Sequence, residues 1–306
     1  MAITDAIMQV ISARLIRRLR SNYVYAARCN KTFQGELMEG GKSFKVNILD
    51  PNSVTFGDYE EKEVDGTQTV ITYPDMAVGD PVVVMVDQQK YWTFSIGDIL
   101  AMQASPDLMD DAADEAAKKL SNSIDDQVRG VMWASASKKF ADATHDFESQ
   151  DTASTAVRSI LNVFGAADRY LTLQNIPMEG RWCVFGPYTR EMIGRSLEDA
   201  ELNLGDAELN ALYRNNFSGM LKGFSTFTSD RATDVSGSNP VEQIIFGNDY
   251  ATIYVDQVSE VESIRLEGSF RTGVRGLYTW GTKMLESKGM LRAQWTYDNA
   301  PALADV

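Results

Sequence analysis

The sequence has few of the residues that usually carry enzyme or metal chemistry. Its 306 residues include two cysteines, Cys29 and Cys183, and one histidine, His145. Without a Cys-x-x-Cys pair, two distant cysteines indicate neither a disulfide framework nor a zinc cage. One histidine cannot supply a His-Glu-x-x-His motif, and no Gly-x-Ser-x-Gly elbow is present to hold a serine nucleophile. We therefore expect no catalytic residues, no metal site and no cofactor, with His145 in an exposed loop.

Long hydrophobic runs and an excess of positive charge are also missing. No apolar run approaches the roughly 18–20 residues of a membrane-spanning helix, and the first residues lack the basic region and cleavage site of a signal peptide. The chain has 43 acidic and 29 basic residues, a net charge of −14. This balance argues against a protein whose main task is to grip nucleic acid, because phosphate binding needs clustered Lys and Arg. A hydrophobic content of 44% is that of a soluble globular protein with a sizeable core.

Two patterns that suggest chemistry have simpler explanations. The stretch 35–43 resembles a phosphate-binding loop, but Glu36 stands where the first glycine belongs, and the stretch joins two predicted strands. Acidic pairs at 110–111 and 125–126 lie in a predicted helix, where the helix dipole and solubility account for them. We therefore expect solvated carboxylates there rather than an acid–base pair in a dry cleft.

Hydrophobic spacing predicts an α+β chain. Apolar residues at helical spacing predict a helix over 3–20 and a long, strongly capped helix over about 106–134, which would be roughly 40–45 Å long. Between them, alternating apolar residues predict strands over 33–49 and 82–96, separated by a polar, turn-rich stretch. The buried side of the long helix is expected to carry Leu108, Ala112, Ala116, Leu120, Ile124, Val128 and Val131.

The second half of the chain alternates between helices and strands. The expected elements, in order, are a polar loop over 137–155, a helix over about 153–171, a buried strand at 182–185, a short helix at 188–197, strands at 223–230 and 241–247, and long strands within 261–297. In the last segment, Gly273, Gly276 and Gly281 are expected to mark bends.

Five stretches of the chain follow one another in an informative order. They are NYVYAARCNKTFQGELMEGGKSFKVNIL, VDQQKYWTFSIGDILAMQASPDLMDDAADEAAKKLSNSIDDQV, LQNIPMEGRWCVFGPYTREMI, GFSTFTSD and FRTGVRGLYTWGTKML. In this order they resemble the major capsid protein of tailed bacteriophages, over roughly residues 20–290. One departure is Asp230, where the family commonly has Asn.

The resemblance implies an α+β fold of the tailed-phage and herpesvirus major capsid type, the Hong Kong 97 type. The implied parts are an N-terminal arm (1–32), an extended β loop (33–92), a peripheral domain with a spine helix (93–152), an axial domain (153–240), and a return β segment of the peripheral domain with the C-terminal tail (241–306). It also implies a structural protein without catalysis, which self-assembles into pentamers and hexamers of an icosahedral or prolate shell enclosing double-stranded DNA. Its place would be the virion capsid, assembled in the host cytoplasm.

Two groups of residues are candidate contacts. An extended β arm can add area and backbone hydrogen bonds on a neighbouring subunit. The candidate arm contacts are Tyr59, Glu60, Glu61, Lys62 and Tyr73. The first predicted helix carries a basic group, which is either a solvated face or a contact with a scaffolding protein or enclosed DNA: Arg14, Arg17, Arg18 and Arg20.

The implied partners are other copies of the chain, a scaffolding protein, portal and decoration proteins, and packaged DNA in weak non-specific contact, with no membrane. Three other interpretations stay open. A bacterial encapsulin is a shell of the same fold that houses enzymes, but its extended loop is generally shorter, and the long polar stretch 59–76 favours a viral coat. The others are an adaptor or tail protein of the virion and an enzyme of unrecognised kind.

Overall fold

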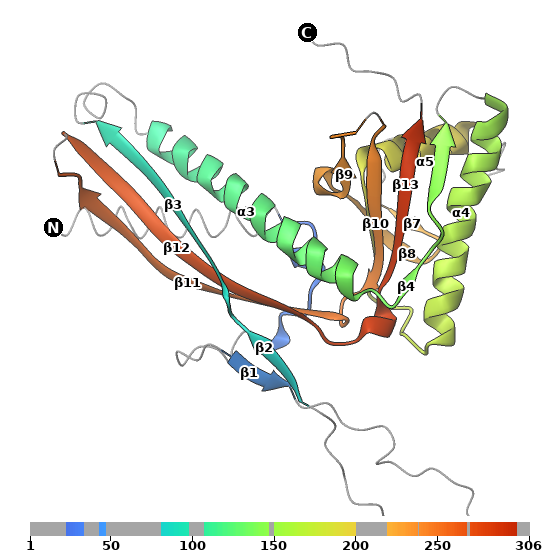
Figure 1. The fold of residues 1–306 in the computed structure, drawn as a ribbon, viewed down its shortest axis with the longest axis horizontal. Helices are drawn as coiled ribbons and strands as arrows, with labels where there is room; N and C mark the ends of the chain where they lie inside the picture. Colours follow the sequence, from blue (N-terminus) through green and yellow to red (C-terminus); the bar gives the residue numbers. More distant parts are fainter. Residues whose placement is uncertain are drawn as a thin grey trace, which may run out of the picture.

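The computed structural model describes residues 23–33, 43–46, 81–97, 107–146, 150–199, 219–237, 239–267 and 270–298. The predicted helix over 3–20 with its arginines, and the candidate arm contacts at 59–62 and 73, lie outside these residues. The described part forms a globular body, from which a long, thin extension projects to one side (Figure 1).

The body is built on a mixed sheet of eight strands. Strand β10 (Val241–Asn248) is antiparallel to β13 (Leu291–Asp298) on one side and to β6 (Arg181–Phe185) on the other. Strand β6 is in turn parallel to β8 (Phe224–Thr228). The remaining strands of this sheet are β4 (Lys138–Lys139), β5 (Ala143–Asp146), β7 (Met220–Leu221) and β9 (Thr233–Asp234).

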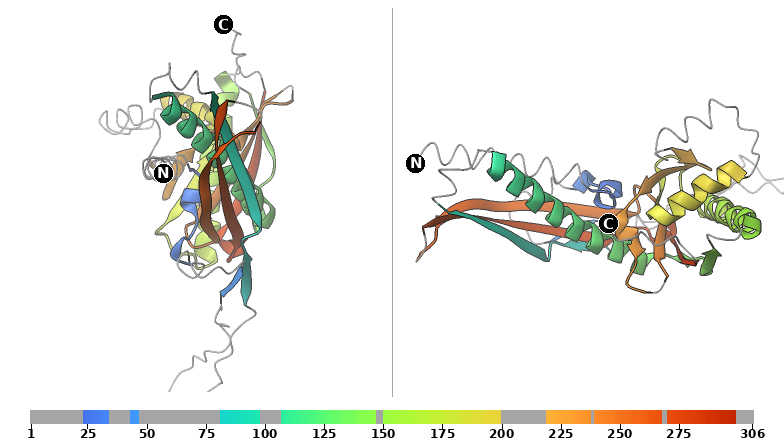
Figure 2. Two further views of the ribbon diagram at one scale, coloured as in Figure 1. Left: turned by 90° about the vertical axis from the view of Figure 1, so that its left-hand side faces the viewer. Right: turned by 90° about the horizontal axis from the view of Figure 1, so that it is seen from above.

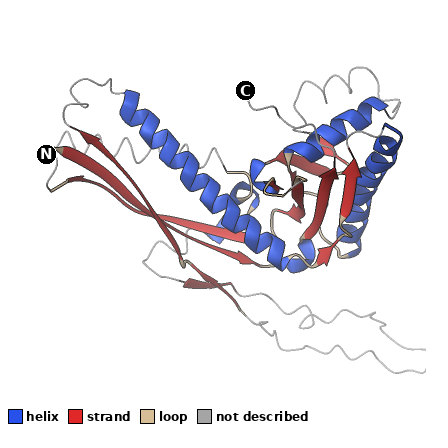
Figure 3. Ribbon diagram, turned by 45° about the horizontal axis from the view of Figure 1, so that its top comes forward, coloured by secondary structure: helices blue, strands red, loops and turns tan. Residues whose placement is uncertain are grey.

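One face of the body sheet is covered by α4 (Gln150–Leu173) and α5 (Pro187–Asp199) (Figure 3). The helical spacing of apolar residues in α4 places Phe164 against the sheet. Its ring meets Phe246 of β10 edge to face, with the ring centroids 5.0 Å apart. This arrangement suits the quadrupoles of the two rings, and it anchors α4 to the centre of the sheet.

The opposite face of the body sheet is covered by the long helix α3 (Asp107–Ser135) and by the 3-10 helix η1 (Ala26–Arg28). Successive residues of β6 alternate between the two cores, because side chains of a strand point to opposite faces. The predicted buried side of α3 is confirmed at Leu120, Ile124 and Val128. At the end of the stripe, Met132 is fully buried, whereas Val131 is only half-buried.

The extension is a second sheet of three long antiparallel strands, which we call the platform. It consists of β11 (Thr252–Arg265), β12 (Arg271–Met284) in the centre, and β3 (Gln88–Gly97). Helix α3 runs along one face of this sheet before it reaches the body (Figure 2). With 29 residues, α3 is roughly 43 Å long, so it braces the platform against the body.

A third, two-stranded sheet lies beside the base of the platform. Strand β1 (Ser43–Val46) is antiparallel to β2 (Val82–Met85), and Val46 pairs with Val82. Both ends of the segment 47–81 therefore leave from one point. We call this strand pair the arm root, because it lies within the predicted extended loop (33–92) and flanks its central segment.

Two sequence expectations for the segment 137–155 are wrong. The polar stretch 137–155 is not a single loop, because it contains β4, β5 and the start of α4. His145 lies in β5, where it is the register partner of Tyr297 in β13. Strands this short have little intrinsic preference, and they form here because the edge of β13 offers parallel pairing.

The predicted boundary at residue 240 falls between β9 and β10, which pair with each other in the body sheet. A chain break into two domains at this residue would therefore not coincide with a break between sheets. The division of the chain into domains, with its other predicted boundaries, stays a prediction.

Candidate assembly surfaces

The arm root has a small hydrophobic core of its own. Val46 of β1 and Val84 of β2 are buried against Ile253 and Val255 of β11. Phe44 stacks on Phe33 at 6.0 Å, which extends this core toward the segment that follows η1. The root is therefore packed on the base of the platform and is separate from the two cores of the body.

The segment 23–30 is fastened to both α3 and the platform. Asp125 of α3 accepts hydrogen bonds from the backbone N–H of Val24 at 2.8 Å and of Ala26 at 3.0 Å. At the other end, the N–H of Asn30 donates to the carbonyl of Thr252 at 2.7 Å, and Asn30 accepts from the N–H of Tyr254. This double attachment fixes the point from which the N-terminal residues 1–22 depart.

The burial of Asp125 corrects the expectation that its acidic pair is solvated. Its side chain is 3% exposed, and this burial raises the pKa of Asp125 to about 6, although three backbone N–H groups favour the carboxylate. The sequence does carry a signal for this position. Asp125 lies three residues before Val128 and one after Ile124, on the buried side of the helix, where a carboxylate needs hydrogen-bond donors.

Three buried tyrosines lie beside this attachment. The hydroxyl oxygens of Tyr23, Tyr254 and Tyr278 are 3.2–3.4 Å apart, and Tyr278 donates to a carboxylate oxygen of Asp256. Burial raises the pKa of each of the three phenols well above its ordinary value. The phenols therefore remain neutral, and the cluster joins the N-terminal segment to β11 and β12 by hydrogen bonds.

Glu242 is a second buried carboxylate, in the middle of the body. It accepts hydrogen bonds from the backbone N–H groups of Gly186, Tyr188 and Thr189, at 2.7–3.1 Å, and from the hydroxyl of Thr233. Burial raises its pKa. Because α5 has no acidic residue in its first turn, Glu242 supplies from β10 the negative charge that a helix N-terminus favours. Its oxygens are occupied by these bonds, which indicates a structural cap.

The platform has apolar side chains that are not buried within a single copy of the chain. Tyr91 of β3 and Leu277 of β12 are register partners, and both are exposed. Near the turn between β11 and β12, Leu266 is partly exposed and Phe270 is 83% exposed. These exposed apolar side chains are candidate contacts with another protein chain.

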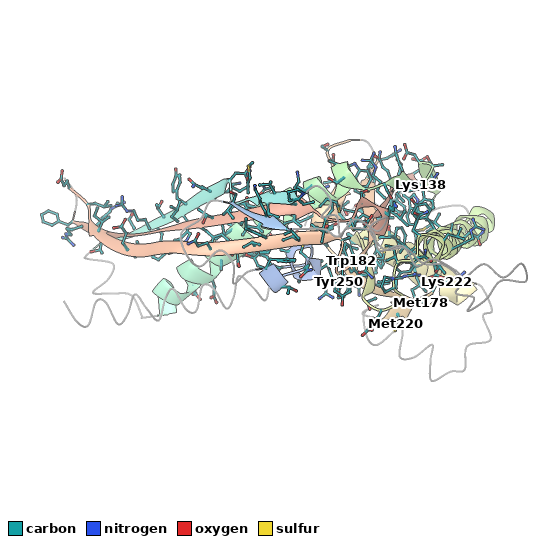
Figure 4. All side chains as sticks on the ribbon, turned by 90° about the horizontal axis from the view of Figure 1, so that it is seen from below. Lys138, Met178, Trp182, Met220, Lys222 and Tyr250 are labelled. Carbon is teal, nitrogen blue, oxygen red and sulfur yellow. The ribbon has the colours of Figure 1, made fainter. Side chains whose placement is uncertain are left out.

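A second group of exposed apolar side chains lies at the surface of the body. It consists of Met178, Met220 and Tyr250, which Figure 4 shows on one side of the body. The loop of Met178 is held rigidly, because the guanidinium of Arg181 donates to the carbonyl of Pro177 at 2.9 Å, and the amide of Asn248 donates to the carbonyl of Glu179 at 3.0 Å. Met178 and Tyr250 are therefore presented from turns with fixed backbones.

The described residues contain no group of three or more His, Cys, Asp or Glu side chains that could hold a metal ion. Burial raises the pKa of both Cys29 and Cys183, so these thiols are not activated nucleophiles. None of the helices in the described ranges is long and apolar enough to cross a membrane.

The candidate contacts predicted from sequence, in the arm and in the first helix, lie outside the described ranges. The structure instead places the paired strands and the fastened segment from which those residues would extend. Sequence reasoning identified the strands of the arm root but not the attachment of residues 23–30 by Asp125.

Comparison with known proteins gives a consistent fold. No protein-family model and no curated protein matches the sequence. Among solved structures, that of Mycobacterium phage Che8 is similar over 89% of this chain and 90% of that chain, with 21% identity and a TM-score of 0.64. The capsid structure of the cyanophage P-SCSP1u matches over 86% and 85%, with 15% identity and a TM-score of 0.60. A virus-like particle from Pyrococcus furiosus matches over 92% and 96%, with 12% identity and a TM-score of 0.54.

These likenesses extend over nearly the whole length of each partner, so they cover the body, the platform and the long helix together. At 21% identity or below, they establish the fold. The chain therefore has the α+β fold of tailed-phage capsid proteins, the Hong Kong 97 type.

Proposed function

We propose that this chain is a major capsid protein, a structural subunit that assembles with identical copies into pentamers and hexamers of an icosahedral or prolate shell around double-stranded DNA. The observation that carries the proposal is the nearly full-length likeness to a capsid structure. The subunit would be located in the virion capsid and would assemble in the host cytoplasm.

The geometry supports this function independently of the likeness. Subunits of a closed shell need heterologous contacts, in which different surfaces of neighbouring copies meet. The platform exposes Tyr91 and Leu277, and the arm root is a second element, with a core of its own. The base of the platform shares a core with the body, whereas its exposed side chains and the arm root are available for neighbouring copies.

The same argument assigns a role to the candidate residues predicted from sequence. Residues Tyr59 to Lys62 and Tyr73 belong to the segment that leaves the arm root, and we propose that they contact a neighbouring subunit. The cluster that includes Arg17 and Arg18 precedes the fastened segment 23–30, and we propose that it contacts a scaffolding protein or the inner surface. Portal and decoration proteins would be further partners.

The proposed subunit has no catalytic function. The two most buried carboxylates of the described ranges, Asp125 and Glu242, are each engaged by backbone N–H groups. The net charge of −14 suits a wall that packaged DNA touches only weakly, because like charges repel.

The test is assembly of the purified chain, followed by electron microscopy and light scattering. We expect closed shells from the wild-type chain, alone or with the proteins encoded by neighbouring genes. Removal of residues 60–72, bridged by a short linker, should leave a folded monomer that no longer assembles, because these residues leave from the arm root. Shells formed by the shortened chain at wild-type yield would contradict the role of the arm.

The contents of the shells test the encapsulin-like alternative. A viral coat protein should enclose DNA when it is produced in infected cells, whereas a cargo shell should contain a protein in constant ratio to the subunit. A monomer that remains compact under every assembly condition and turns over a small molecule would contradict both shell functions.

A further inference from the structure

Two glycines of β12 lie where another part of the chain approaches unusually closely. A Cβ atom added at Gly281 would lie 2.2 Å from the carbonyl oxygen of Met85 and 3.1 Å from Cα of Val86. A Cβ added at Gly276 would lie 2.5 Å from the indole ring of Trp92. Neither glycine has a positive φ, so the reason for the missing side chain is close approach rather than backbone conformation. Strand β12 runs without interruption through both positions, and the expectation that these glycines mark bends stays a prediction.

The two glycines differ in what a side chain would displace. At Gly276 the obstacle is the side chain of Trp92, which lies on the neighbouring strand in register with this glycine. At Gly281 the obstacle is backbone, at the junction of β2 and β3. A side chain can rotate away from a new methyl group, whereas two backbones can separate only if the strand itself moves.

The chain between β2 and β3 crosses β12 at Gly281, and this crossing adjoins the core of the arm root. Gly281 pairs with Val255 of β11, and Val255 is packed with Val46 and Val84 in that core. The core holds the root onto the platform by burial of apolar side chains. The backbone contact at Gly281 sets how closely the root approaches β12, and together the two attachments define its angle.

We propose that Gly281 is a positioning residue for shell assembly, which sets the direction in which the arm leaves the platform. This inference rests on the proposed function, because it concerns the contact that the arm makes with a neighbouring copy. An alanine at this position requires the root to move by about 1 Å or more to reach ordinary contact distance. Over a strand pair of about 10–13 Å this displacement tilts the root by roughly 5°.

The direction of the arm can be measured in the unassembled subunit. Cysteines introduced at Lys45 of β1 and at Lys288, both exposed, carry spin labels, while Cys29 and Cys183 are buried and remain unlabelled. Electron paramagnetic resonance then gives the distance between the two labels. We expect Gly281→Ala to change the mean distance by about 1 Å or more.

The matched control is Gly273→Ala on the same strand. A Cβ at Gly273 would lie 3.5 Å from the flexible side chain of Leu266, which is ordinary contact, so this variant should leave the label distance unchanged. An unchanged distance in Gly281→Ala, in a folded subunit, overturns the proposal.

If Gly281→Ala does not yield folded subunits, Val84→Ala tests the same attachment. It removes packing from the core of the root without adding a clash, so the label distances should become more widely distributed while the body stays folded. If the label distances in Val84→Ala are distributed as narrowly as in the wild type, the proposal is overturned. The root would then keep its direction without the packing that holds it against the backbone contact at Gly281.

Assembly provides the second readout. We expect loss of closed shells for Gly281→Ala and wild-type yield for Gly130→Ala, because a Cβ at Gly130 has no neighbour within 4 Å and lies outside the platform and the arm root. Shells of normal size from Gly281→Ala subunits whose label distance has shifted overturn the positioning role. If the wild-type chain forms no shells, the proposed function fails, and the label distance alone still decides whether Gly281 directs the arm.

Discussion

The body and the platform differ in how much of each sheet a single copy covers. In the body, helices α4 and α5 cover one face of the sheet and α3 covers the other, and every residue of β6 is buried. In the platform, α3 packs on one face, while Tyr91 and Leu277 remain exposed as a cross-strand pair. The body is therefore completed within one copy, and the platform is not.

This difference separates folding from assembly. Side chains of the body contribute to the free energy of unfolding of a single copy, because their burial is complete before any other copy arrives. Exposed side chains of the platform contribute little to it, but they become buried if a second copy covers them. Substitutions in the two regions should accordingly affect different measurements.

The largest contrast is expected between two phenylalanines. Phe246 of β10 is fully buried and meets the rings of Phe164 and Phe224 at 5.0 and 5.4 Å, so Phe246→Ala should lower the free energy of unfolding by about 3–5 kcal/mol. Phe270→Ala, at an 83% exposed position, should change it by less than about 0.5 kcal/mol. Denaturant unfolding of the unassembled subunit measures both values.

Shell yield measures the role of Phe270 in contacts between copies. Phe270→Ala should form fewer shells at unchanged stability, if the platform is covered by another copy. If Phe270→Ala assembles as well as the wild type, the end of the platform is not a contact surface, and the proposed division between the regions loses its main support.

A smaller effect is expected at Asp125, which joins the N-terminal segment to α3 between the two regions. Burial raises its pKa from 3.8 to about 6 in the folded protein. A carboxyl group with a raised pKa binds a proton on folding, so its contribution to stability is complete below about pH 4 and is lost as the pH rises through 6. A shift of about two units corresponds to roughly 3 kcal/mol.

The variant Asp125→Asn cannot ionise, so the free energy of unfolding should depend less on pH between about pH 4 and 7. The matched control is Asp126→Asn, which removes the neighbouring carboxylate that is only half-buried. Unfolding curves at several pH values provide the measurement. Equal pH dependence in Asp125→Asn and the wild type would show that this carboxyl group does not bind a proton on folding.

The next effect lies within the body and leaves the platform unchanged. Arg181 is 2% exposed, and its guanidinium donates to the carbonyls of Ile176 and Pro177 and to Asp168. Lysine cannot make these bonds simultaneously, so Arg181→Lys should lower stability by about 1.5–3 kcal/mol. Hydrogen exchange should also become faster in the loop 174–180, whereas the exposed control Arg169→Lys should change neither.

Regular elements could be predicted from the sequence, because their signals are local. The apolar pattern predicted the strands of the arm root and, in the platform, β3 and β12, and the helical stripe of Leu120, Ile124 and Val128 predicted α3. Most of β11 was not predicted, because this strand begins at Thr252 and the expected strands begin at residue 261. The strands β4 and β5 were missed, since their pairing is provided by β13 and not by their own residues.

The features that position the assembly surfaces were harder to predict, because they depend on contacts between distant segments. Nothing in the sequence indicates that Asp125 meets residues 24 and 26, although its place on the helix indicates burial. A glycine in a strand indicates either a bend or a close approach, and only the crossing with Met85 distinguishes these roles at Gly281.

The smallest expected effect is a gain in stability at Gly130, near the end of α3. A Cβ atom there would have no neighbour within 4 Å, and the residue is exposed. Because alanine restricts the unfolded chain more than glycine does, Gly130→Ala should raise the free energy of unfolding by about 0.5–1 kcal/mol. Its shell yield should equal that of the wild type, since the change reaches neither the platform nor the arm root. A loss of shells at raised stability would show that another copy approaches the backbone of α3 at this glycine, which would extend the contact surface from the platform onto the helix that braces it.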